Sequence, residues 1–339
     1  MMVYRAKAPL RVSFAGGGTD VPPFPAQEGG LVLNATINRH AYGTLRPRED
    51  SQIQIESADF GLALDYDREE GPVFDGKLDL VKAAIRKLDQ EGSKGFELFL
   101  HSSAPPGSGL GSSSTLMVTL IGLLKEFHGL PMTDYEVAQL SYHVEREDMG
   151  IKGGLQDQYA ATFGGFNFIE FSADRVIVNP LRISDSIVNE LEHNMLLCYT
   201  GATRRSDHII EDQTDRLAQG NEDTLAGLRM QKEFAVEMKN ALLRGQPDRF
   251  GELLHDAWQA KKKMSTRITT PFIDEAYTAA REAGALGGKV TGAGGGGYML
   301  FYCLFDKKHR VAEVLTKLGG TVDEFSFESK GLETWSMSE

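Results

Sequence analysis

The apolar and polar positions in the first half of the chain predict a mixture of strands and helices. Strand-like segments, which are apolar and β-branched or alternate between apolar and polar positions, are residues 5–14, 31–45, 53–55, 96–101 and 164–171. Residues 78–88 carry apolar side chains at helical spacing, and residues 115–124 have the composition of a buried helix. Residues 133–147 open with Thr133 and Glu136, the capping-box pattern of a helix start. The first half is therefore expected to form a mixed α/β domain.

The second half of the chain is predicted to be mainly helical. Long stretches at helical spacing are residues 207–217, 222–243, 248–264, 273–283 and 307–318. Strand-like segments are residues 195–200, 298–304 and 321–326. The closing order of helix, strand, helix and strand indicates a compact α+β second domain. We place the division between residues 175 and 195, which gives domains 1–185 and 186–339.

The composition is that of a globular protein with room for two domains. The chain has 339 residues, of which 41% are hydrophobic, and a net charge of -12 at pH 7. This charge disfavours nucleic acid and membranes as partners, because both bind basic faces, although a local basic pocket can still hold an anionic substrate. Cys198 and Cys303 lie in apolar surroundings, which predicts reduced, buried thiols and neither a disulfide framework nor a metal cluster. Since the sequence has no apolar signal core or membrane-spanning run, we expect a cytoplasmic protein.

Residues 104–114 form a glycine- and serine-rich segment directly before the apolar helix. They read Ala-Pro-Pro-Gly-Ser-Gly-Leu-Gly-Ser-Ser-Ser. Gly107, Gly109 and Gly111 permit backbone conformations that a β-carbon would block, so successive N–H groups can converge on a phosphate at the helix start. The alternative is a surface turn, against which the stiff Pro-Pro entry and the apolar helix both argue. Because no lysine follows the last glycine and the dinucleotide-binding spacing is absent, the sequence predicts a third type of nucleotide-phosphate loop.

Two further glycine clusters accompany strand-like segments. Residues 291–297 read Thr-Gly-Ala-Gly-Gly-Gly-Gly, and four consecutive glycines beside a strand indicate a backbone that another group approaches closely. A flexible hairpin is the alternative. Residues 15–20 read Ala-Gly-Gly-Gly-Thr-Asp after the first strand, so Asp20 stands where open α/β sites usually collect ligands. A simple turn is the alternative for this cluster.

Asp157 is the acidic residue for which these surroundings predict a chemical role. It shortly precedes the apolar run 159–163, so its carboxylate is expected to point into the protein, where an unpaired charge is costly. A nearby cation or magnesium ion would keep it ionised and able to accept a proton from a substrate hydroxyl. Glu147 and Asp148, at a glycine-interrupted helix end, are instead expected to be solvated.

Positive charge is concentrated in two places, residues 204–205 and residues 261–263, the latter near Trp258. Lysines on a helix usually form a solvated face. In an acidic protein, however, such clusters are also candidates for holding a phosphate.

The three glycine motifs, in this order and with Pro-Pro-Gly-Ser-Gly-Leu-Gly-Ser-Ser in the middle, resemble the GHMP kinase superfamily of galactokinase, homoserine, mevalonate and phosphomevalonate kinases. The resemblance extends over effectively the whole chain. It implies a two-domain α+β fold, with an N-terminal mixed α/β ATP-binding domain, a C-terminal ferredoxin-like α+β domain and the active site between them. It also implies ATP and Mg2+ as cofactors.

By similarity, each part of the active site can be assigned to residues of this chain. The loop around the ATP phosphates would comprise Pro106, Gly107, Ser108, Gly109, Leu110, Gly111, Ser112 and Ser113. Ser113 and Glu145 would bind magnesium, Asp157 would be the base or charge-stabilising acid, and Arg11 matches the family's basic residue near the transferred group.

Within the superfamily, the chain is most similar to D-glycero-D-manno-heptose 7-phosphate kinases. The resemblance is carried by Pro-Leu-Arg-Val-Ser-Phe-Ala-Gly-Gly-Gly-Thr-Asp at residues 9–20 and Gly-Gly-Leu-Gln-Asp-Gln-Tyr-Ala-Ala at residues 153–161. Galactokinases carry Gly-Glu-His-Thr-Asp, where this chain has Gly17 and Gly18 in place of the Glu and His that approach the sugar, which implies a wider sugar site. The candidate substrate-binding residues are Gly17, Gly18, Thr19, Asp20, Gly294, Gly295, Arg204, Lys261 and Lys262, the last three for the substrate's phosphate.

The resemblance implies ATP-dependent phosphorylation of the anomeric hydroxyl of D-glycero-D-manno-heptose 7-phosphate to the 1,7-bisphosphate, for nucleotide-activated heptose synthesis. The expected partners are this sugar phosphate and ATP, and a homodimer is left open. One alternative is a kinase for an unphosphorylated sugar, since a fucokinase-like family shares the Trp and paired Lys. The other alternative is a non-catalytic sugar- or nucleotide-binding regulator, against which Ser113, Glu145 and Asp157 argue.

Overall fold

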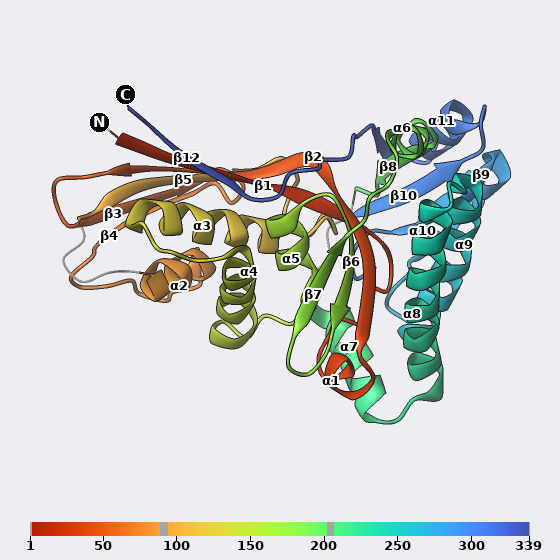
Figure 1. Cartoon of the computed structure of the whole chain (residues 1–339), viewed down its shortest axis with the longest axis horizontal. Helices are drawn as coiled ribbons and strands as arrows, with labels where there is room; N and C mark the ends of the chain where they lie inside the picture. The colour runs from red at the N-terminus through yellow and green to blue at the C-terminus, as the bar shows by residue number, and fades with distance from the viewer. Residues whose placement is uncertain (1, 89–93, 202–206, 339) are drawn as a thin grey trace.

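The first part of the chain forms a large sheet that runs through the left of Figure 1. The computed structural model describes residues 2–88, 94–201 and 207–338. The eight-stranded sheet has the order β12-β1-β2-β5-β3-β4, and β6 pairs with both β2 and β7. Its strands are β1 (Met2–Ala15), β2 (Gly30–Pro47), β3 (Gln52–Ser57), β4 (Leu62–Asp67), β5 (Phe96–Ser102), β6 (Phe166–Phe171), β7 (Val176–Pro180) and β12 (Glu333–Ser338). All neighbouring strands are antiparallel except β3 and β5.

Helices pack on one face of this sheet, below it in Figure 1. They are α2 (Asp79–Leu88), α3 (Ser112–His128), α4 (Asp134–Tyr142), the π-helical turn η1 (His143–Asp148) and α5 (Gln156–Phe163), while the short α1 (Phe24–Glu28) follows β1. Helix α3 is buried along most of its length, because it lies between the sheet and the other helices. The capping box at Thr133 and Glu136 that starts α4 is confirmed.

The second part forms a four-stranded antiparallel sheet with the order β11-β8-β10-β9. Its strands are β8 (Met195–Tyr199), β9 (Ala285–Val290), β10 (Tyr298–Cys303) and β11 (Thr321–Asp323). The helices are α6 (Asp185–Asn194), α7 (Asp207–Ala218), α8 (Glu222–Leu243), α9 (Pro247–Met264), α10 (Pro271–Ala283) and α11 (Lys308–Lys317). Helical segments separate β8 from β9 and β10 from β11, which with this strand order is the ferredoxin-like arrangement. The expected mixed α/β first part and ferredoxin-like α+β second part are confirmed.

Two features of the chain path differ from the sequence expectation. The last strand, β12, leaves the second part and pairs with β1, so the segment 186–339 does not lie wholly in one half. The helix predicted over residues 133–147 changes to π-helical winding at His143. Neither feature has a local signal in the sequence. Whether a returning strand forms depends on the sheet edge that it covers. Whether a π turn forms depends on the contacts that its side chains make.

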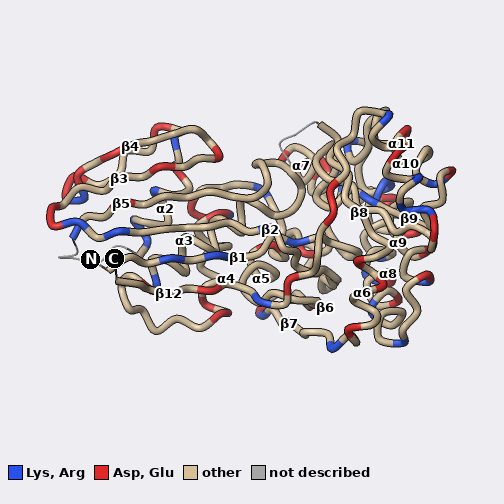
Figure 2. Tube along the Cα trace, turned by 90° about the horizontal axis from the view of Figure 1, so that it is seen from above, with Lys and Arg blue, Asp and Glu red and all other residues tan. Residues whose placement is uncertain are grey.

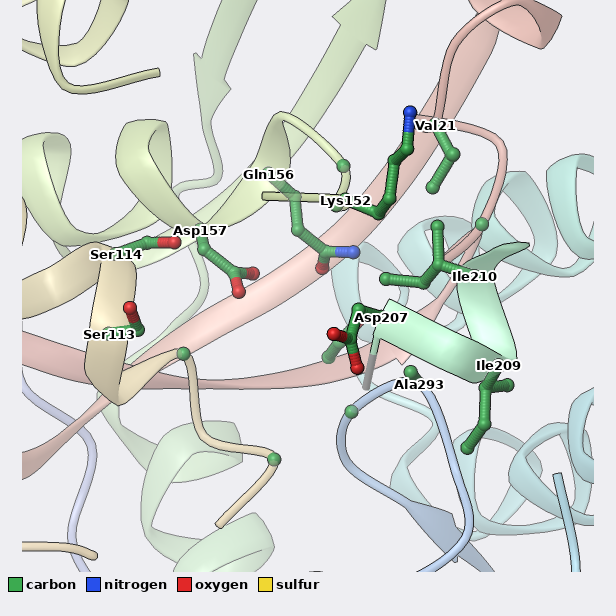
Figure 3. A pocket seen from close by; sticks show the side chains of 18 of the residues that line it. Val21, Ser113, Ser114, Lys152, Gln156, Asp157, Asp207, Ile209, Ile210 and Ala293 are labelled. Carbon is green, nitrogen blue, oxygen red and sulfur yellow. The ribbon is translucent and has the colours of Figure 1, made fainter. Parts of the chain in front are cut away.

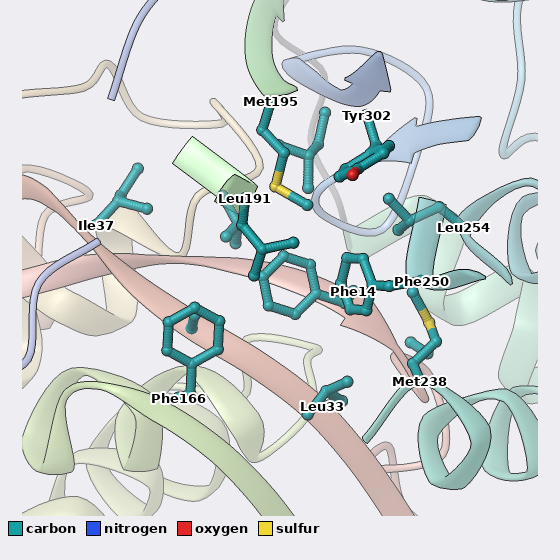
Figure 4. Packing of buried hydrophobic residues seen from close by; sticks show 14 of the residues in the cluster. Phe14, Leu33, Ile37, Phe166, Leu191, Met195, Met238, Phe250, Leu254 and Tyr302 are labelled. Carbon is teal, nitrogen blue, oxygen red and sulfur yellow. The ribbon is translucent and has the colours of Figure 1, made fainter. Parts of the chain in front are cut away.

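A shared hydrophobic cluster joins the two parts of the molecule (Figure 4). Phe14 of β1 packs edge-on against Phe250 of α9, with ring centroids 5.1 Å apart, and Leu191 and Tyr302 of the second half belong to the same cluster. Close-packed protein interiors have low compressibility, so packed elements move little relative to each other. The cluster therefore fixes how β1 and α9, which both reach the cleft described below, sit relative to each other.

The charged residues are spread along both parts of the chain. Figure 2 shows acidic and basic positions interspersed on the trace of each half, so the net charge of -12 is not confined to one segment. Cys198 and Cys303 are buried free thiols, and burial raises their pKa values to about 11 and about 12. In the described part of the chain, no helix is both long and apolar enough to cross a bilayer.

Candidate active site

The glycine-rich loop before α3 lines a cleft. Gly107, Gly109 and Gly111 all adopt left-handed conformations, with φ of 76°, 81° and 77°, which alternate with ordinary residues. Gly111 is the N-cap of α3 and contributes no side-chain cap, so the first N–H groups of the helix keep their hydrogen-bonding capacity. Free N–H groups and the positive end of the helix dipole are the features by which a helix start can bind an anion.

Arg11 links the acidic residue Asp157 to this loop. The Nε and Nη2 atoms of Arg11 lie 2.8 and 2.6 Å from Asp157 Oδ1, and its Nη1 donates to the carbonyl oxygen of Gly109 at 2.7 Å. Both contacts to the carboxylate use Oδ1. The side chain of Arg11 is 5% exposed and that of Asp157 is 19% exposed. A buried guanidinium therefore holds one carboxylate oxygen and leaves the other, Oδ2, without a contact to Arg11, in a side chain that lines the cleft.

Glu145 and Ser113 bring a carboxylate and a hydroxyl together beside the loop. Glu145 is 1% exposed and lies on η1, and π turns of this kind often re-aim a functional side chain. Ser113 Oγ donates to Glu145 Oε1 at 3.1 Å, while Ser114 Oγ and Gln158 Nε2 donate to Oε2, each at 2.7 Å. Arg146 Nη1 lies 3.4 Å from Oε1. The described residues contain no cluster of three or more His, Cys, Asp or Glu side chains arranged for a metal.

The third glycine motif packs against the phosphate loop. Thr291 Oγ1 donates to Gly109 O at 3.0 Å, and the N–H of Tyr298 donates to Ser108 O at 2.8 Å. A Cβ added at Gly297 would lie 2.3 Å from the same Ser108 oxygen, so this position must be glycine. The close backbone approach expected for residues 291–297 is confirmed, and the backbone it meets is the phosphate loop.

Asp20 also lines the cleft. It is 1% exposed, and its oxygens accept from the N–H groups of Gly18 at 2.9 Å and Gln156 at 3.0 Å, and from Gln156 Nε2 at 3.2–3.3 Å. Burial raises the pKa of the Asp20 carboxyl, while these backbone donors oppose the shift. A Cβ at Gly154 would stand 2.0 Å from Asp20 Oδ2, so this glycine makes room for the carboxylate.

Most of the predicted site residues line one cleft of about 480 Å³ between the two parts of the molecule, which is partly seen in Figure 3. Those in its lining are Arg11, Gly17, Gly18, Asp20, Pro106, Gly107, Gly109, Gly111, Ser112, Ser113, Glu145, Asp157, Lys261 and Gly294. Ser108 and Leu110 are buried beneath the loop, and Gly295 also lies outside the lining. Arg204 lies outside the described residues.

Two predicted substrate contacts do not reach the cleft. The Thr19 hydroxyl is fully buried and bonds to the carbonyl oxygens of Gly16 and Leu31, so it holds the turn after β1 rather than a ligand. The Lys262 ammonium lies 5.9 Å from the centre of the Trp258 ring and 3.6 Å from Asp274 Oδ1, on a face of α9 that does not line the cleft. Adjacent helix residues point about 100° apart, which separates Lys262 from Lys261.

The cleft also contains residues that sequence reasoning missed. Gln156, Arg146 and Lys152 each lie close in sequence to a predicted residue, so their neighbours were a usable signal. Ser13 of β1 lies two residues from Arg11 and had the same signal, whereas Gln213 of α7 had none, because the fold brings it in from a helix with ordinary composition.

Comparison with known proteins places this architecture in a family. The model of the GHMP kinases N terminal domain matches residues 79–165, and that of the GHMP kinases C terminal domain matches residues 238–323. The "D-glycero-alpha-D-manno-heptose 7-phosphate kinase" of Campylobacter jejuni is 41% identical over 339 residues, which cover 99% of both chains.

Solved structures agree with this assignment. A crystal structure named as a D-glycero-D-manno-heptose 1-phosphate kinase from Bacteroides thetaiotaomicron superposes with a TM-score of 0.84 at 37% identity, over 99% of this chain and 100% of that one. The galactokinase of Lactococcus lactis shares the fold with a TM-score of 0.78 at 23% identity, over 98% and 95% of the two chains. Full-length identity of this order, together with the two matching domain models, means that the chain belongs to the GHMP kinase family, among its sugar kinases.

Proposed function

We propose that this protein transfers the γ-phosphoryl group of ATP to the anomeric hydroxyl of D-glycero-D-manno-heptose 7-phosphate, which gives the 1,7-bisphosphate for nucleotide-activated heptose synthesis. The observation that carries the chemistry is the Arg11 bridge. One guanidinium contacts both Asp157 Oδ1 and Gly109 O, so the proton acceptor and the phosphate loop are fixed to each other. The identity to the Campylobacter jejuni kinase supports the choice of sugar.

The nucleotide would lie with its phosphates on the loop and on the start of α3. Phosphoryl transfer has a loose transition state, so positioning and charge neutralisation supply most of the rate acceleration. The N–H groups around Gly107, Gly109 and Gly111 are preorganised for this, because their conformation is set by the backbone before any ligand arrives.

Ser113 and Glu145 would hold Mg2+. Their donor set fits: both are hard oxygen ligands, they are 3.1 Å apart, and both line the cleft beside the loop. Magnesium bound to a nucleotide usually takes one or two protein ligands and completes its shell with phosphate oxygens and water. When bound, the ion neutralises charge on the β- and γ-phosphates.

Asp157 would accept the proton of the anomeric hydroxyl. Its Oδ2 atom is not used by Arg11 and its side chain lines the cleft, so a hydroxyl can bond to Oδ2 without breaking the ion pair. Arg11 positions the carboxylate and adds positive charge next to the transferred group. The burial of Arg11 keeps this charge poorly screened by water.

The acceptor end of the cleft offers a cation for the 7-phosphate. Lys152 lies beside Val21 and Ile210, away from Ser113 (Figure 3). Among the described residues, its ammonium forms no hydrogen bond or ion pair, unlike that of Lys261. Among the described residues, Lys152 is therefore our candidate for binding the sugar phosphate, in place of Lys262.

A panel of acceptors tests the proposed function. The names of the two relatives differ in the position of the phosphate, so the panel should contain the heptose 7-phosphate, the heptose 1-phosphate, free heptose, fucose and galactose. ADP release in Mg-ATP gives kcat/KM for each. We expect the 7-phosphate to exceed every other acceptor by about 10- to 100-fold, since a charged phosphate contact contributes about 1.5–3 kcal/mol. A higher kcat/KM for a plain sugar than for the 7-phosphate would mean that the protein is a kinase for an unphosphorylated sugar. No turnover with any acceptor would favour a non-catalytic regulator.

A further inference from the structure

Three buried polar side chains from distant parts of the chain surround the backbone of Gly17. A Cβ built on Gly17 would lie 3.4 Å from Ser13 Oγ, 3.4 Å from Gln156 Nε2 and 4.0 Å from Lys261 Nζ. The three residues belong to β1, α5 and α9, and all line the cleft. They are 2%, 8% and 5% exposed, so each is more than nine-tenths buried. We call these three residues and Gly17 the Gly17 pocket.

Two side-chain atoms of these residues lack hydrogen-bond partners among the described residues. They are Ser13 Oγ and Gln156 Oε1. Leaving a buried polar atom without a partner costs about 1–3 kcal/mol, and native proteins rarely accept this without a reason. Ser13 Oγ lies next to Gly17, and Gln156 Oε1 belongs to the amide whose Nε2 lies there, so two such atoms on residues that line one cleft indicate a ligand group that supplies the missing bonds.

The orientation of the Gln156 amide follows from its neighbour. Asp20 is a carboxylate that receives backbone N–H groups, so it can only accept, and the Gln156 Nε2 must face it. The carbonyl oxygen Oε1 is therefore turned away from Asp20. In Figure 3 the Gln156 amide extends into the same space as the Asp157 carboxylate, its neighbour on the first turn of α5. Gln156 thus presents an acceptor close to the proposed site of proton transfer.

Lys261 supplies the complementary donor. Its Nζ donates to Gly292 O at 2.6 Å, which uses one of three protons and ties α9 to the third glycine motif. Arg11 repels its charge, while Asp20 and Asp157 attract it. The remaining protons are available on the cleft side. Lys261 therefore does not lie at the 7-phosphate end suggested by the sequence, but beside the reacting groups.

The backbone at Ser13 is held in place independently of any ligand. Lys289 of β9 is fully buried, and its Nζ donates to Ser13 O at 2.6 Å. This bond joins β1 to the second sheet directly below the pocket. The Ser13 hydroxyl is thus presented by a fixed strand, as a specificity group requires.

We propose that the Gly17 pocket binds the 2-hydroxyl of the acceptor sugar, the one next to the reacting anomeric hydroxyl. The hydroxyl donates to Gln156 Oε1 and accepts from Lys261 Nζ, with Ser13 Oγ completing its shell. Neighbouring side chains of α5 then hold neighbouring oxygens of one ring, Asp157 the anomeric oxygen and Gln156 the next. This inference rests on the proposed sugar kinase function and adds the residues that select the acceptor.

Gly17→Ala is the sharpest perturbation of this pocket. Its Cβ would make only ordinary contacts of 3.4–4.0 Å, and Gly17 is not among the glycines with positive φ, so the backbone accepts alanine. The methyl group nevertheless occupies the space of the 2-hydroxyl. Gly18→Ala is the matched contrast: there φ is +104° and the Cβ would stand 2.5 Å from Met264 Cε, so that variant should lower the melting temperature.

The experiment compares heptose 7-phosphate with its 2-deoxy analogue. We expect the wild type to prefer the 2-hydroxy acceptor by about 10- to 100-fold in kcat/KM, the range of one hydrogen bond with a charged partner. In Gly17→Ala, and in Ser13→Ala and Lys261→Met, this ratio should fall toward 1, while the KM for ATP and the melting temperature of Gly17→Ala and Ser13→Ala stay unchanged. A purely structural role would lower activity toward both acceptors and leave the ratio intact.

The outcomes separate this inference from the proposed function. If the wild type phosphorylates heptose 7-phosphate but treats the 2-deoxy analogue equally, or if Gly17→Ala keeps the wild-type ratio, the pocket assignment is wrong and the function stands. If another sugar proves to be the acceptor, the function is wrong and the same ratio is measured with that sugar and its 2-deoxy form. No phosphorylation of any sugar would contradict both.

Discussion

Replacing Asp157 by asparagine removes proton acceptance and the negative charge while the hydrogen-bond geometry to Arg11 can be kept. Both Arg11 contacts end on Oδ1, so an asparagine with its carbonyl oxygen in that position keeps them. Its amide nitrogen then replaces Oδ2 and cannot accept a proton. Arg11 also keeps its bond to Gly109 O, which does not involve the carboxylate.

The magnitudes follow from this geometry. Loss of a positioned general base lowers kcat by about 10²–10⁴-fold, equivalent to about 3–5 kcal/mol of transition-state stabilisation. Losing the countercharge of the buried Arg11 should lower the free energy of unfolding by about 1–3 kcal/mol, less than the stability of an ordinary domain. ATP affinity should change less than about threefold, because the loop N–H groups, Ser113 and Glu145 are not altered.

Three measurements on Asp157→Asn check these numbers: steady-state kcat with heptose 7-phosphate, calorimetric affinity for Mg-ATP and the melting temperature. Glu147→Gln is the control, because that exposed carboxylate lies beside His143 and outside the cleft lining. A folded Asp157→Asn enzyme with kcat within threefold of the wild type would refute the reasoning. So would a parallel loss of ATP affinity, since that would make Asp157 part of the nucleotide site.

Three further predictions address the metal, the pH profile and the helix cap. Glu145→Gln should raise the magnesium concentration for half-maximal activity at least about tenfold, whereas Glu147→Gln should leave it unchanged. If the two variants require the same magnesium concentration, Glu145 is not a metal ligand. Burial lowers the pKa of Lys261 to about 8, and its charged form is the hydrogen-bond donor, so kcat/KM for the sugar should fall as pH rises above about 8. Lys261→Arg should move this fall in kcat/KM to higher pH. If the fall stays at the same pH, it belongs to another group. Thr133→Ala breaks the capping box of α4 and should lower the free energy of unfolding by about 1 kcal/mol, measured by urea titration, with kcat unchanged. No loss of stability would mean that the cap does not stabilise the fold.

The parts of the site that are local in sequence were predictable, and the parts assembled by the fold were not. The position of the glycine-rich loop before a buried helix could be predicted because the two segments are contiguous, and the inward position of Asp157 followed from its apolar neighbours. Lys261 and Lys262 are adjacent in sequence, yet only Lys261 lines the cleft, because the rotation of α9 and its packing on β9 decide which one points inward. Ser13 gains its significance from Gln156 and Lys261, which lie more than 140 residues away in sequence.

The fold shows the same division between local and long-range information. Helix α8 was predicted with its observed bounds, since helical periodicity is a local property. The pairing of β12 with β1 could not be predicted in this way, because strand pairing depends on which edge remains open after the rest of the sheet has formed. The π turn at η1 was likewise hidden, as its sequence fits an ordinary helix.

The most direct test of the central claim is the position of the new phosphate. Heptose 7-phosphate incubated with the protein and Mg-ATP should give a second sugar-phosphate resonance in the phosphorus NMR spectrum, coupled to the anomeric proton, in amounts equal to the ADP formed. The same mixture with Asp157→Asn should give this signal at least about 100-fold more slowly. A new phosphate on any other hydroxyl, or ADP formed with release of inorganic phosphate alone, would contradict the account.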